Sequence, residues 1–425
     1  MTQPQVSVGI MRAPSVRYEL HGAYERIEKH GDTVFRPLSS DSCFTLHDVT
    51  IGIGFHWQRE EDQRFAGQLV LRREPDGTVQ VINRLPVEEY LCSVISSEMK
   101  ATAPKAFLQA SAVISRSWLL SQMKHRGPAA TTSEHEKMDG QADSDACIGG
   151  SSKPLFRRLK WYDKQDHIGF DVCSDDHCQR YQGITRVATP SVREAVLATA
   201  GQVLWDGEDI CDARFGKCCG GVTELFSTCW QDADLPYLAS VHDVADSSVH
   251  SLWGDLTDEA TARAWIQASP PAFCNVEGQR ILSLILNNYD LGTREFFRWH
   301  VAYSRQELSL LVKKRAGLDL GQILHVEPLQ RGPSGRIRLL RIEGSKASMT
   351  VGKELEIRRI LSETHLYSSA FYVEETTDGF ILHGAGWGHG VGMGQIGAAV
   401  MGERGYAYTD ILRHYYPGAL LHKLY

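Results

Sequence analysis

The sequence lacks any run of apolar residues that approaches the roughly 18–20 needed for a membrane-spanning helix. Residues 1–20 have neither a basic region nor an apolar stretch, so no signal peptide is visible. An excess of positive charge is also missing, since the formal net charge is −7. These absences argue against a membrane span and against nucleic acid as a partner.

Cysteine is too thinly spread for a disulfide scaffold, with ten residues scattered over a chain of 425. Internal repeats and low-complexity tracts are not apparent either. The remaining composition, 42% hydrophobic and 23% charged, is ordinary for a folded globular protein. The length allows a sizeable core and two or three domains.

The clearest local pattern is a pair of helices, each introduced by a proline. Pro86 and Pro104 stand where a helix takes its first residue, because proline presets φ and its missing N–H is not needed there. We therefore predict helices over residues 87–99 and 105–124. Apolar residues recur at helical spacing on one side of both segments: Val87, Leu91, Val94 and Ile95, then Phe107, Ala110, Ile114 and Trp118.

Two charged residues stand out on these helices. Glu98 falls on the apolar stripe of the first helix, where desolvation would favour its protonated form, as a general acid near neutral pH requires. The alternative is a frayed glutamate at the end of a core helix. Arg116 is expected to project away from the apolar side of the second helix.

A cluster of metal-ligand residue types follows. His167, Cys173, His177 and Cys178 fall within a dozen residues, and this spacing is a plausible zinc pattern, looser than paired Cys-x2-Cys knuckles. A solvent loop with unbound thiols is the alternative.

The last distinctive stretch is FILHGAGWGHGVGMGQIGAA, residues 380–399, where glycines would let the backbone turn tightly and expose amides to a ligand. Trp387 could stack on a ring of that ligand, or the stretch is a structural turn with His389 hydrogen-bonded inside. The window Gly392-x-Gly394-x-x-Gly397 matches a dinucleotide fingerprint, but no second strand with an acidic end follows at the required distance.

LPVEEYLCSVISSEM, AFLQASAVISRSW and GWGHGVGMGQIG together resemble the stage II sporulation protein D / LytB (amidase enhancer) family. Lys100 and the pair Ser117-Trp118 depart mildly from the family pattern. The resemblance implies a peptidoglycan lytic transglycosylase whose catalytic acid aligns with Glu98. It also implies that Arg116 orients this acid or binds an N-acetyl or lactyl group.

Further residues are implied by the same resemblance. The segment that contains Phe215, Gly220, Gly221, Thr223 and Glu224 matches a family segment, but Cys218-Cys219 stand where many relatives have two serines near the substrate. We thus expect substrate contacts from Arg116, Gly220, Gly221, Thr223, Trp387, His389 and Gln395. Zinc ligands carried over by position are His167, Cys173 and Cys178, with His177 as an alternative, in a structural site.

Hydrophobic patterning predicts a mixed α+β protein with a helical catalytic core and a β-rich second lobe. The expected parts are an N-terminal β-rich segment (1–83), a catalytic core (84–242), an inserted or flanking lobe (243–370) and a C-terminal glycine-rich segment completing the core (371–425). Residues 125–153 show no periodicity and are predicted to be a loop or insertion.

The leading hypothesis is therefore cleavage of MurNAc-GlcNAc linkages in glycan strands, leaving 1,6-anhydro ends. A non-catalytic peptidoglycan-binding module that stimulates a cell-wall amidase is the alternative from another class. Zinc-dependent hydrolysis at His167, Cys173 and Cys178 is a third. The substrate would place the protein outside the cytoplasm, although no export signal is visible.

Overall fold

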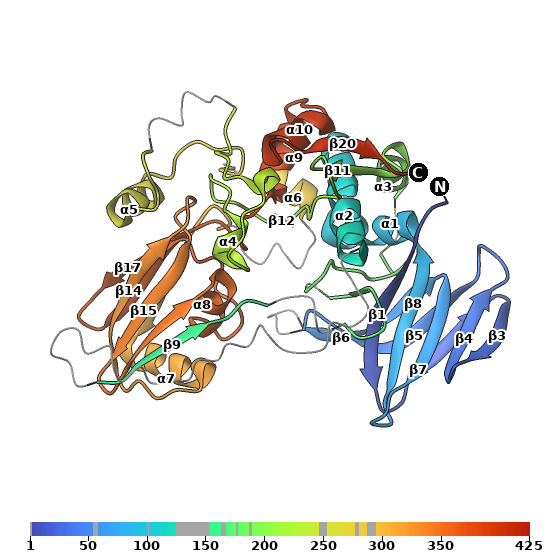
Figure 1. Ribbon diagram of the computed structural model, residues 1–425, viewed down its shortest axis with the longest axis horizontal. Helices are drawn as coiled ribbons and strands as arrows, with labels where there is room; N and C mark the ends of the chain where they lie inside the picture. Colours follow the sequence, from blue (N-terminus) through green and yellow to red (C-terminus); the bar gives the residue numbers. More distant parts are fainter. Residues whose placement is uncertain are drawn as a thin grey trace.

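The computed structural model describes residues 2–425 apart from 54–57, 101, 125–152, 163–166, 176, 187–188, 246–252, 277–279 and 287–294. The loop predicted over residues 125–153 thus lies almost wholly outside the described residues. The elements form two β-rich lobes with a group of helices beside them, and the two chain ends lie close together near α3 (Figure 1). The mixed α+β architecture predicted from the sequence is confirmed.

The N-terminal lobe is built on a six-stranded sheet of order β10-β1-β8-β7-β4-β3. Its strands are β1 (Gln5–Ala13), β3 (Tyr24–Lys29), β4 (Asp32–Pro37), β7 (Gln68–Arg73), β8 (Val79–Pro86) and β10 (Val172–Cys173). Beside it lies a three-stranded sheet of β2 (Tyr18–His21), β5 (Cys43–Ile51) and β6 (Arg59–Ala66). Because β10 pairs in parallel with β1, it brings the cysteine segment to the sheet edge.

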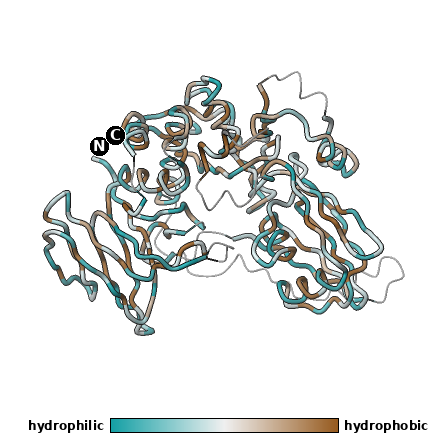
Figure 2. Tube along the Cα trace, turned by 180° about the vertical axis from the view of Figure 1, so that it is seen from behind, coloured by the Kyte–Doolittle hydropathy of each residue, from teal (hydrophilic) through white to brown (hydrophobic). Residues whose placement is uncertain are grey.

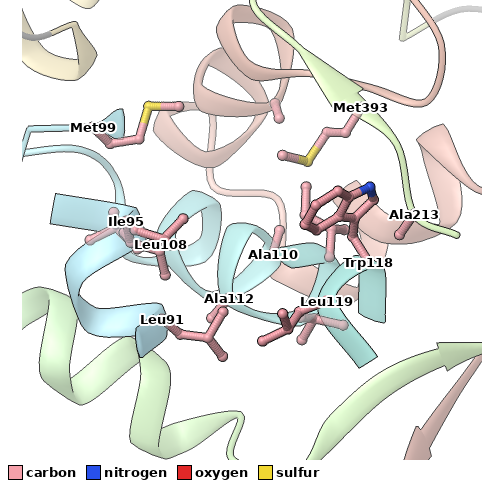
Figure 3. Packing of buried hydrophobic residues seen from close by; sticks show 14 of the residues in the cluster. Leu91, Ile95, Met99, Leu108, Ala110, Ala112, Trp118, Leu119, Ala213 and Met393 are labelled. Atoms are coloured by element: carbon pink, nitrogen blue, oxygen red, sulfur yellow. The ribbon is translucent and has the colours of Figure 1, made fainter. Parts of the chain in front are cut away.

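The helical part follows directly from β8. α1 (Val87–Glu98) and α2 (Lys105–Lys124) confirm the predicted pair, and the predicted apolar residues of both are buried. Against α2 pack three further helices and one strand: α3 (Pro190–Ala198), α9 (Gln395–Glu403), α10 (Tyr408–Tyr415) and β11 (Gln202–Trp205). Figure 3 looks into this core, where Ile95 of α1 lies beside Leu108 of α2 and Met393 lies beside Trp118 of α2.

The second lobe has its own hydrophobic core. A four-stranded sheet contains β14 (Ile323–Arg331), β15 (Ile337–Gly344), β16 (Ser348–Gly352) and β9 (Leu155–Leu159). A three-stranded sheet contains β13 (Arg298–Ser304), β18 (Gly379–Ala385) and β17 (Phe371–Glu375). The lobe's helices are α7 (Arg305–Ala316) and α8 (Glu354–Ile360). Hydrophobic and hydrophilic residues alternate along the strands of both lobes, as expected for sheets with one packed face (Figure 2).

Short elements connect these parts: β12 (Phe215–Gly216), α4 (Phe226–Cys229), the 3₁₀ turn Pro236–Leu238, α5 (Glu259–Ala268), α6 (Arg280–Ile285), β19 (Met393–Gly394) and β20 (Leu420–Lys423). β9 belongs to the sheet of the second lobe although it lies within the range 84–242 in sequence. The domain limits drawn from the sequence stay a prediction. Among the described residues, no helix combines the length and apolar character needed to cross a bilayer.

Local signals varied in how well they predicted helix ends. In the sequence, Ser304 followed three residues later by Glu307 predicts a capping box. It is confirmed at α7, where the Ser304 hydroxyl accepts from the Glu307 N–H and the Glu307 carboxylate accepts from the Ser304 N–H. The sequence also predicts a helix from Thr409 capped by Thr409 or Asp410. This cap is wrong, because α10 begins one residue earlier, after Ala407, with no side-chain cap.

A buried ion pair holds α1 against α2. The Arg116 guanidinium donates to both carboxylate oxygens of Glu88, over 2.9 Å from Nε and 2.6 Å from Nη2, and its side chain is 0% exposed. The Tyr425 hydroxyl and the Gly201 N–H also donate to Glu88 Oε1. One carboxylate therefore joins both helices to the segment before β11 and to the C-terminal residue.

Removing one partner of this pair should be strongly destabilising, because the other charge would remain buried without compensation. We expect Glu88→Gln to lower the free energy of unfolding by about 3–5 kcal/mol. The matched control is Glu89→Gln, on the same helix as Glu88. It breaks the exposed ion pair between Glu89 and Arg193 of α3 and should cost about 1 kcal/mol or less. Equal losses for the two variants in urea unfolding would contradict this role of the buried pair.

Candidate functional site

Glu98 is the last residue of α1, and its side chain is partly exposed. It lines a pocket of about 250 Å³ of empty space, part of which is open to solvent. The other lining residues come from α1, α2, β12 and the glycine-rich segment: Val94, Ile95, Met99, Ser111, Ile114, Ser115, Phe215, Met393 and Gln395. Glu98 is the one ionisable side chain among these described lining residues.

The Glu98 carboxylate is held by a backbone group from the cysteine segment. The Arg180 N–H donates to Glu98 Oε1 over 3.3 Å. In the part of the chain that the structure describes, the other oxygen, Oε2, has no hydrogen-bond partner. The arrangement fixes one oxygen and leaves the second for a ligand.

The segment that supplies this N–H is itself fixed on both sides. Gln179 accepts from the Tyr90 hydroxyl of α1 over 3.3 Å and donates to the Ser115 carbonyl of α2 over the same distance. Tyr181 stacks on Tyr90 with ring centroids 5.1 Å apart and donates to Asn83 Oδ1 over 2.5 Å. The amide that contacts Glu98 is therefore set by packing on both helices.

The four predicted metal-ligand residues do converge. Ligand atoms of His167, Cys173, His177 and Cys178 all lie within 4.8 Å of one another. His167 Nε2 lies 3.0 Å from Cys178 Sγ, and His177 Nδ1 lies 3.6 Å from the same sulfur. Hydrogen bonds with Cys178, His167 and His177 hold the pKa of Cys173 well below its usual range, against the effect of burial. A thiolate beside imidazole nitrogens is a donor set that suits zinc.

Arg116 is not where the sequence placed it. It was expected to project from the helix towards substrate, but it is fully buried and paired with Glu88. Its remaining hydrogen bonds go to the carbonyl oxygens of Gln202 and Val196. The expectation that Arg116 binds sugar or touches Glu98 is corrected, because the buried guanidinium is not accessible to a ligand. Hydrophobic periodicity alone does not reveal that Arg116 pairs with Glu88.

The segment around Gly220 packs against the glycine-rich segment. Cys218 and Trp387 exchange backbone hydrogen bonds of 3.1 and 2.8 Å. Gly220 has φ +82°, and a Cβ there would lie 2.7 Å from the Gly386 nitrogen. Gly221, with φ +112°, is likewise backed by the Trp265 ring. These glycines thus permit close approach of two backbones, which leaves their expected contact with substrate without geometric support.

Thr223 is likewise engaged within the protein. Its side chain is buried, accepts from the Val241 N–H over 2.7 Å and donates to the Ala239 carbonyl over 3.3 Å. The neighbouring Glu224 is buried as well, and its carboxylate accepts from Ser334 and Thr228. This arrangement favours a structural role for the threonine.

The three residues predicted from the glycine-rich segment differ in position. Gln395 opens α9 and lines the Glu98 pocket. Trp387 is partly buried, and Tyr367 stacks on its ring at 4.4 Å between centroids. His389 Nδ1 accepts from the Val391 N–H, and burial, together with the nearby Arg214 guanidinium, lowers the pKa of His389 to about 3. His389 is therefore neutral at physiological pH and part of the turn.

Two contributors to the site were missed from the sequence. Ser111 lines the pocket, and its buried hydroxyl has no hydrogen-bond partner among the described residues. A serine on a core-facing helix does not by itself indicate a binding site, so the sequence did not single out Ser111. Arg180 acts through its backbone N–H, which any residue type carries, so only its place two residues after Cys178 pointed to it.

Two family models match the chain. Residues 75–205 match the model described as stage II sporulation protein, and residues 224–392 match a domain of unknown function. The first range contains Glu98, the buried ion pair and the His/Cys cluster. The greater part of the glycine-rich stretch falls within the second, which ends before Gln395.

Individual relatives agree with this match. Stage II sporulation protein D of Bacillus amyloliquefaciens is 26% identical over 338 residues, covering 79% of this chain and 74% of that protein. The protein of the same name from Bacillus subtilis (strain 168) is 24% identical over 340 residues, covering 80% and 75%. The amidase enhancer of Bacillus subtilis (strain 168) is 26% identical over 249 residues, covering 54% of this chain and 32% of that protein. The resemblance drawn from the sequence is confirmed: the chain is similar to the stage II sporulation protein D and amidase-enhancer proteins, and its residues 75–205 match the stage II sporulation protein model.

Proposed function

We propose that the protein is a peptidoglycan lytic transglycosylase that cleaves MurNAc-GlcNAc linkages, with Glu98 as general acid and then general base. Its relationship to stage II sporulation protein D and amidase enhancer supports a role at the cell wall. Action on glycan strands would place it outside the cytoplasm.

The observation that carries the proposal is that, among the described residues lining the pocket, Glu98 supplies the one carboxyl group and no other side chain is ionisable. Hydrolysis of a glycoside usually requires two carboxyl groups at a set separation, one acting on the leaving group and one on water or the sugar carbon. A lytic reaction needs one, since the nucleophile is a hydroxyl of the substrate itself.

In the proposed reaction, the protonated Glu98 side chain gives its proton to the oxygen that bridges the two sugars. That bond breaks, and the 6-hydroxyl of the muramoyl residue forms the new bond to its own C1. The hydroxyl proton passes to the Glu98 carboxylate, which restores the acid. Glu98 Oε2 is the oxygen suited to both transfers, because Oε1 is held by the Arg180 N–H.

Contacts with the substrate are proposed for two of the predicted residues. Gln395 lies in the pocket with Glu98 and offers both a donor and an acceptor to an N-acetyl group. Trp387 keeps part of its ring exposed, although Tyr367 already covers one face. Arg116, Gly220, Gly221, Thr223 and His389 are left out of the proposed contacts because the protein itself engages them.

His167, Cys173, His177 and Cys178 would hold zinc in a structural site. Four protein ligands close a tetrahedral site and leave no open position for water, which disfavours zinc-dependent hydrolysis. When bound, the ion would supply a rigid cross-link between β10 and the segment that follows it. Since Arg180 lies two residues after Cys178, this cross-link would position the N–H that holds Glu98.

Glu98→Gln should reduce turnover about 10²–10⁴-fold, the usual contribution of general acid catalysis, and still bind glycan. The assay is digestion of peptide-stripped glycan strands by the purified protein, with anhydro-ended sugars detected by mass spectrometry. The exposed Glu89→Gln on the same helix is the control and should keep full activity. Unchanged turnover in Glu98→Gln would rule out this residue as the acid.

The alternative function is non-catalytic stimulation of a cell-wall amidase, favoured by the similarity to amidase enhancer. It predicts no anhydro-ended product from the wild-type protein and faster product release by an added amidase. The two hypotheses thus differ in whether the protein cleaves glycan strands when no amidase is added.

Cys173→Ser should lose one equivalent of zinc per chain relative to the wild-type protein, measured by inductively coupled plasma mass spectrometry. Its turnover should fall because the Arg180 N–H is no longer positioned. The residual activity of Glu98→Gln should not fall further when Cys173→Ser is added, because both act through one carboxylate. Cys43→Ser, which removes a partly exposed thiol of β5, is the control. Equal zinc content in Cys173→Ser and Cys43→Ser would refute the metal cross-link.

A further inference from the structure

Three further cysteines and one aspartate converge in the interior, away from the His/Cys cluster. Cys218, Cys219 and Cys274 are each no more than 2% exposed, and Asp243 is 0% exposed. The sulfurs of Cys219 and Cys274 lie 3.5 Å apart. The ligand atoms of Cys219, Asp243 and Cys274 all lie within 4.8 Å of one another.

Such a group differs from ordinary core cysteines because it includes a buried carboxylate. Burying a carboxylate is costly unless it is paired or coordinates a metal. Asp243 accepts from the Tyr415 hydroxyl over 2.6 Å and from the Cys274 N–H over 2.9 Å, and His414 Nε2 lies 3.5 Å from Oδ1. These contacts orient the carboxylate, as the outer partners of a metal ligand do.

A second observation is the guanidinium of Arg298, which reaches the backbone directly after Cys219, since its Nη1 donates to the Gly220 carbonyl over 3.0 Å. Its hydrogen bonds go to backbone carbonyls, those of Gly220, Trp265, Ile266 and Phe297. Within the described ranges it makes no ion pair with a carboxylate, and the groups that act on it electrostatically are the three thiols. A partly buried cation therefore faces sulfur atoms that are neutral unless a metal or base deprotonates them.

We propose that Cys219, Asp243 and Cys274 form a second zinc site inside the protein. Two thiolates on one tetrahedral zinc ion, each at about 2.3 Å, stand roughly 3.8 Å apart, close to the separation of the Cys219 and Cys274 sulfurs. Two thiolates and a carboxylate carry three negative charges, which a divalent cation and the Arg298 guanidinium balance.

The position of the site indicates what the ion stabilises. Gly397 of α9 backs onto the carboxylate: a Cβ there would lie 2.6 Å from Asp243 Oδ2. Gly394, the residue before α9, backs onto Cys219 in the same way, with a Cβ 3.6 Å from its sulfur. The ion would thus cross-link three distant segments behind the start of α9, where Gln395 enters the Glu98 pocket. Relatives with serines in place of Cys218-Cys219 would lack this cross-link.

The test is zinc content per chain for the full-length protein purified under reducing conditions. We expect Cys219→Ser and Cys274→Ser each to lose one equivalent relative to the wild-type protein. Cys211→Ser removes another buried thiol, one outside both groups, and should lose none. The same zinc content in Cys219→Ser as in Cys211→Ser would overturn the proposal.

Native mass spectrometry keeps the test decisive if the variants fold poorly. The wild-type protein should carry one zinc ion more than the first cluster accounts for, so Cys173→Ser should retain one. After cobalt replaces zinc, Cys173→Ser should still show sulfur-to-cobalt charge-transfer absorption. A zinc-free Cys173→Ser chain would contradict the site. This result does not depend on transglycosylase activity.

Discussion

The buried ion pair between Glu88 and Arg116 is the constraint on which the site depends. It fixes the beginning of α1 against the middle of α2, and the Tyr425 hydroxyl extends the same contact to the end of the chain. Because a helix is stiff over twelve residues, an anchor near its first turn also sets where its last residue, Glu98, lies. Arg116, which was expected to touch substrate, thus acts on the position of Glu98 indirectly. It holds Glu88, which lies ten residues before Glu98 on the same helix.

Around this anchor, the pocket is assembled from parts that are distant in sequence. α1 supplies the acid, the cysteine segment supplies the N–H that holds one of its oxygens, and the glycine-rich segment supplies Met393 and Gln395. Two cysteine groups lie behind these parts, one beside the Arg180 segment and one behind the start of α9. A metal ion bound at the first group would fix the Arg180 segment, and one bound at the second would fix the start of α9; both segments line or contact the Glu98 pocket.

Features with a local cause could be predicted from the sequence, and those set by distant partners could not. The helix pair, the convergence of the four His/Cys residues and the capping box at Ser304 follow from proline position, spacing and side-chain chemistry. Arg116 is buried because it pairs with Glu88, and the sequence identifies Glu88 only as part of a family motif, without indicating its partner. β3 and β6 carry charged residues on both faces, so neither alternates clearly and the sequence does not predict them as strands. Gly220 could suggest either a ligand or a second backbone, and only the structure identifies the second backbone.

The central claim is that Glu98 meets a sugar linkage in this pocket. The most direct measurement is a crystal structure of the Glu98→Gln variant with a short MurNAc-GlcNAc oligomer. The account predicts the bridging oxygen within about 3.2 Å of the side chain at position 98, with Gln395 near an N-acetyl group. An oligomer bound elsewhere, with position 98 facing only solvent, would contradict it.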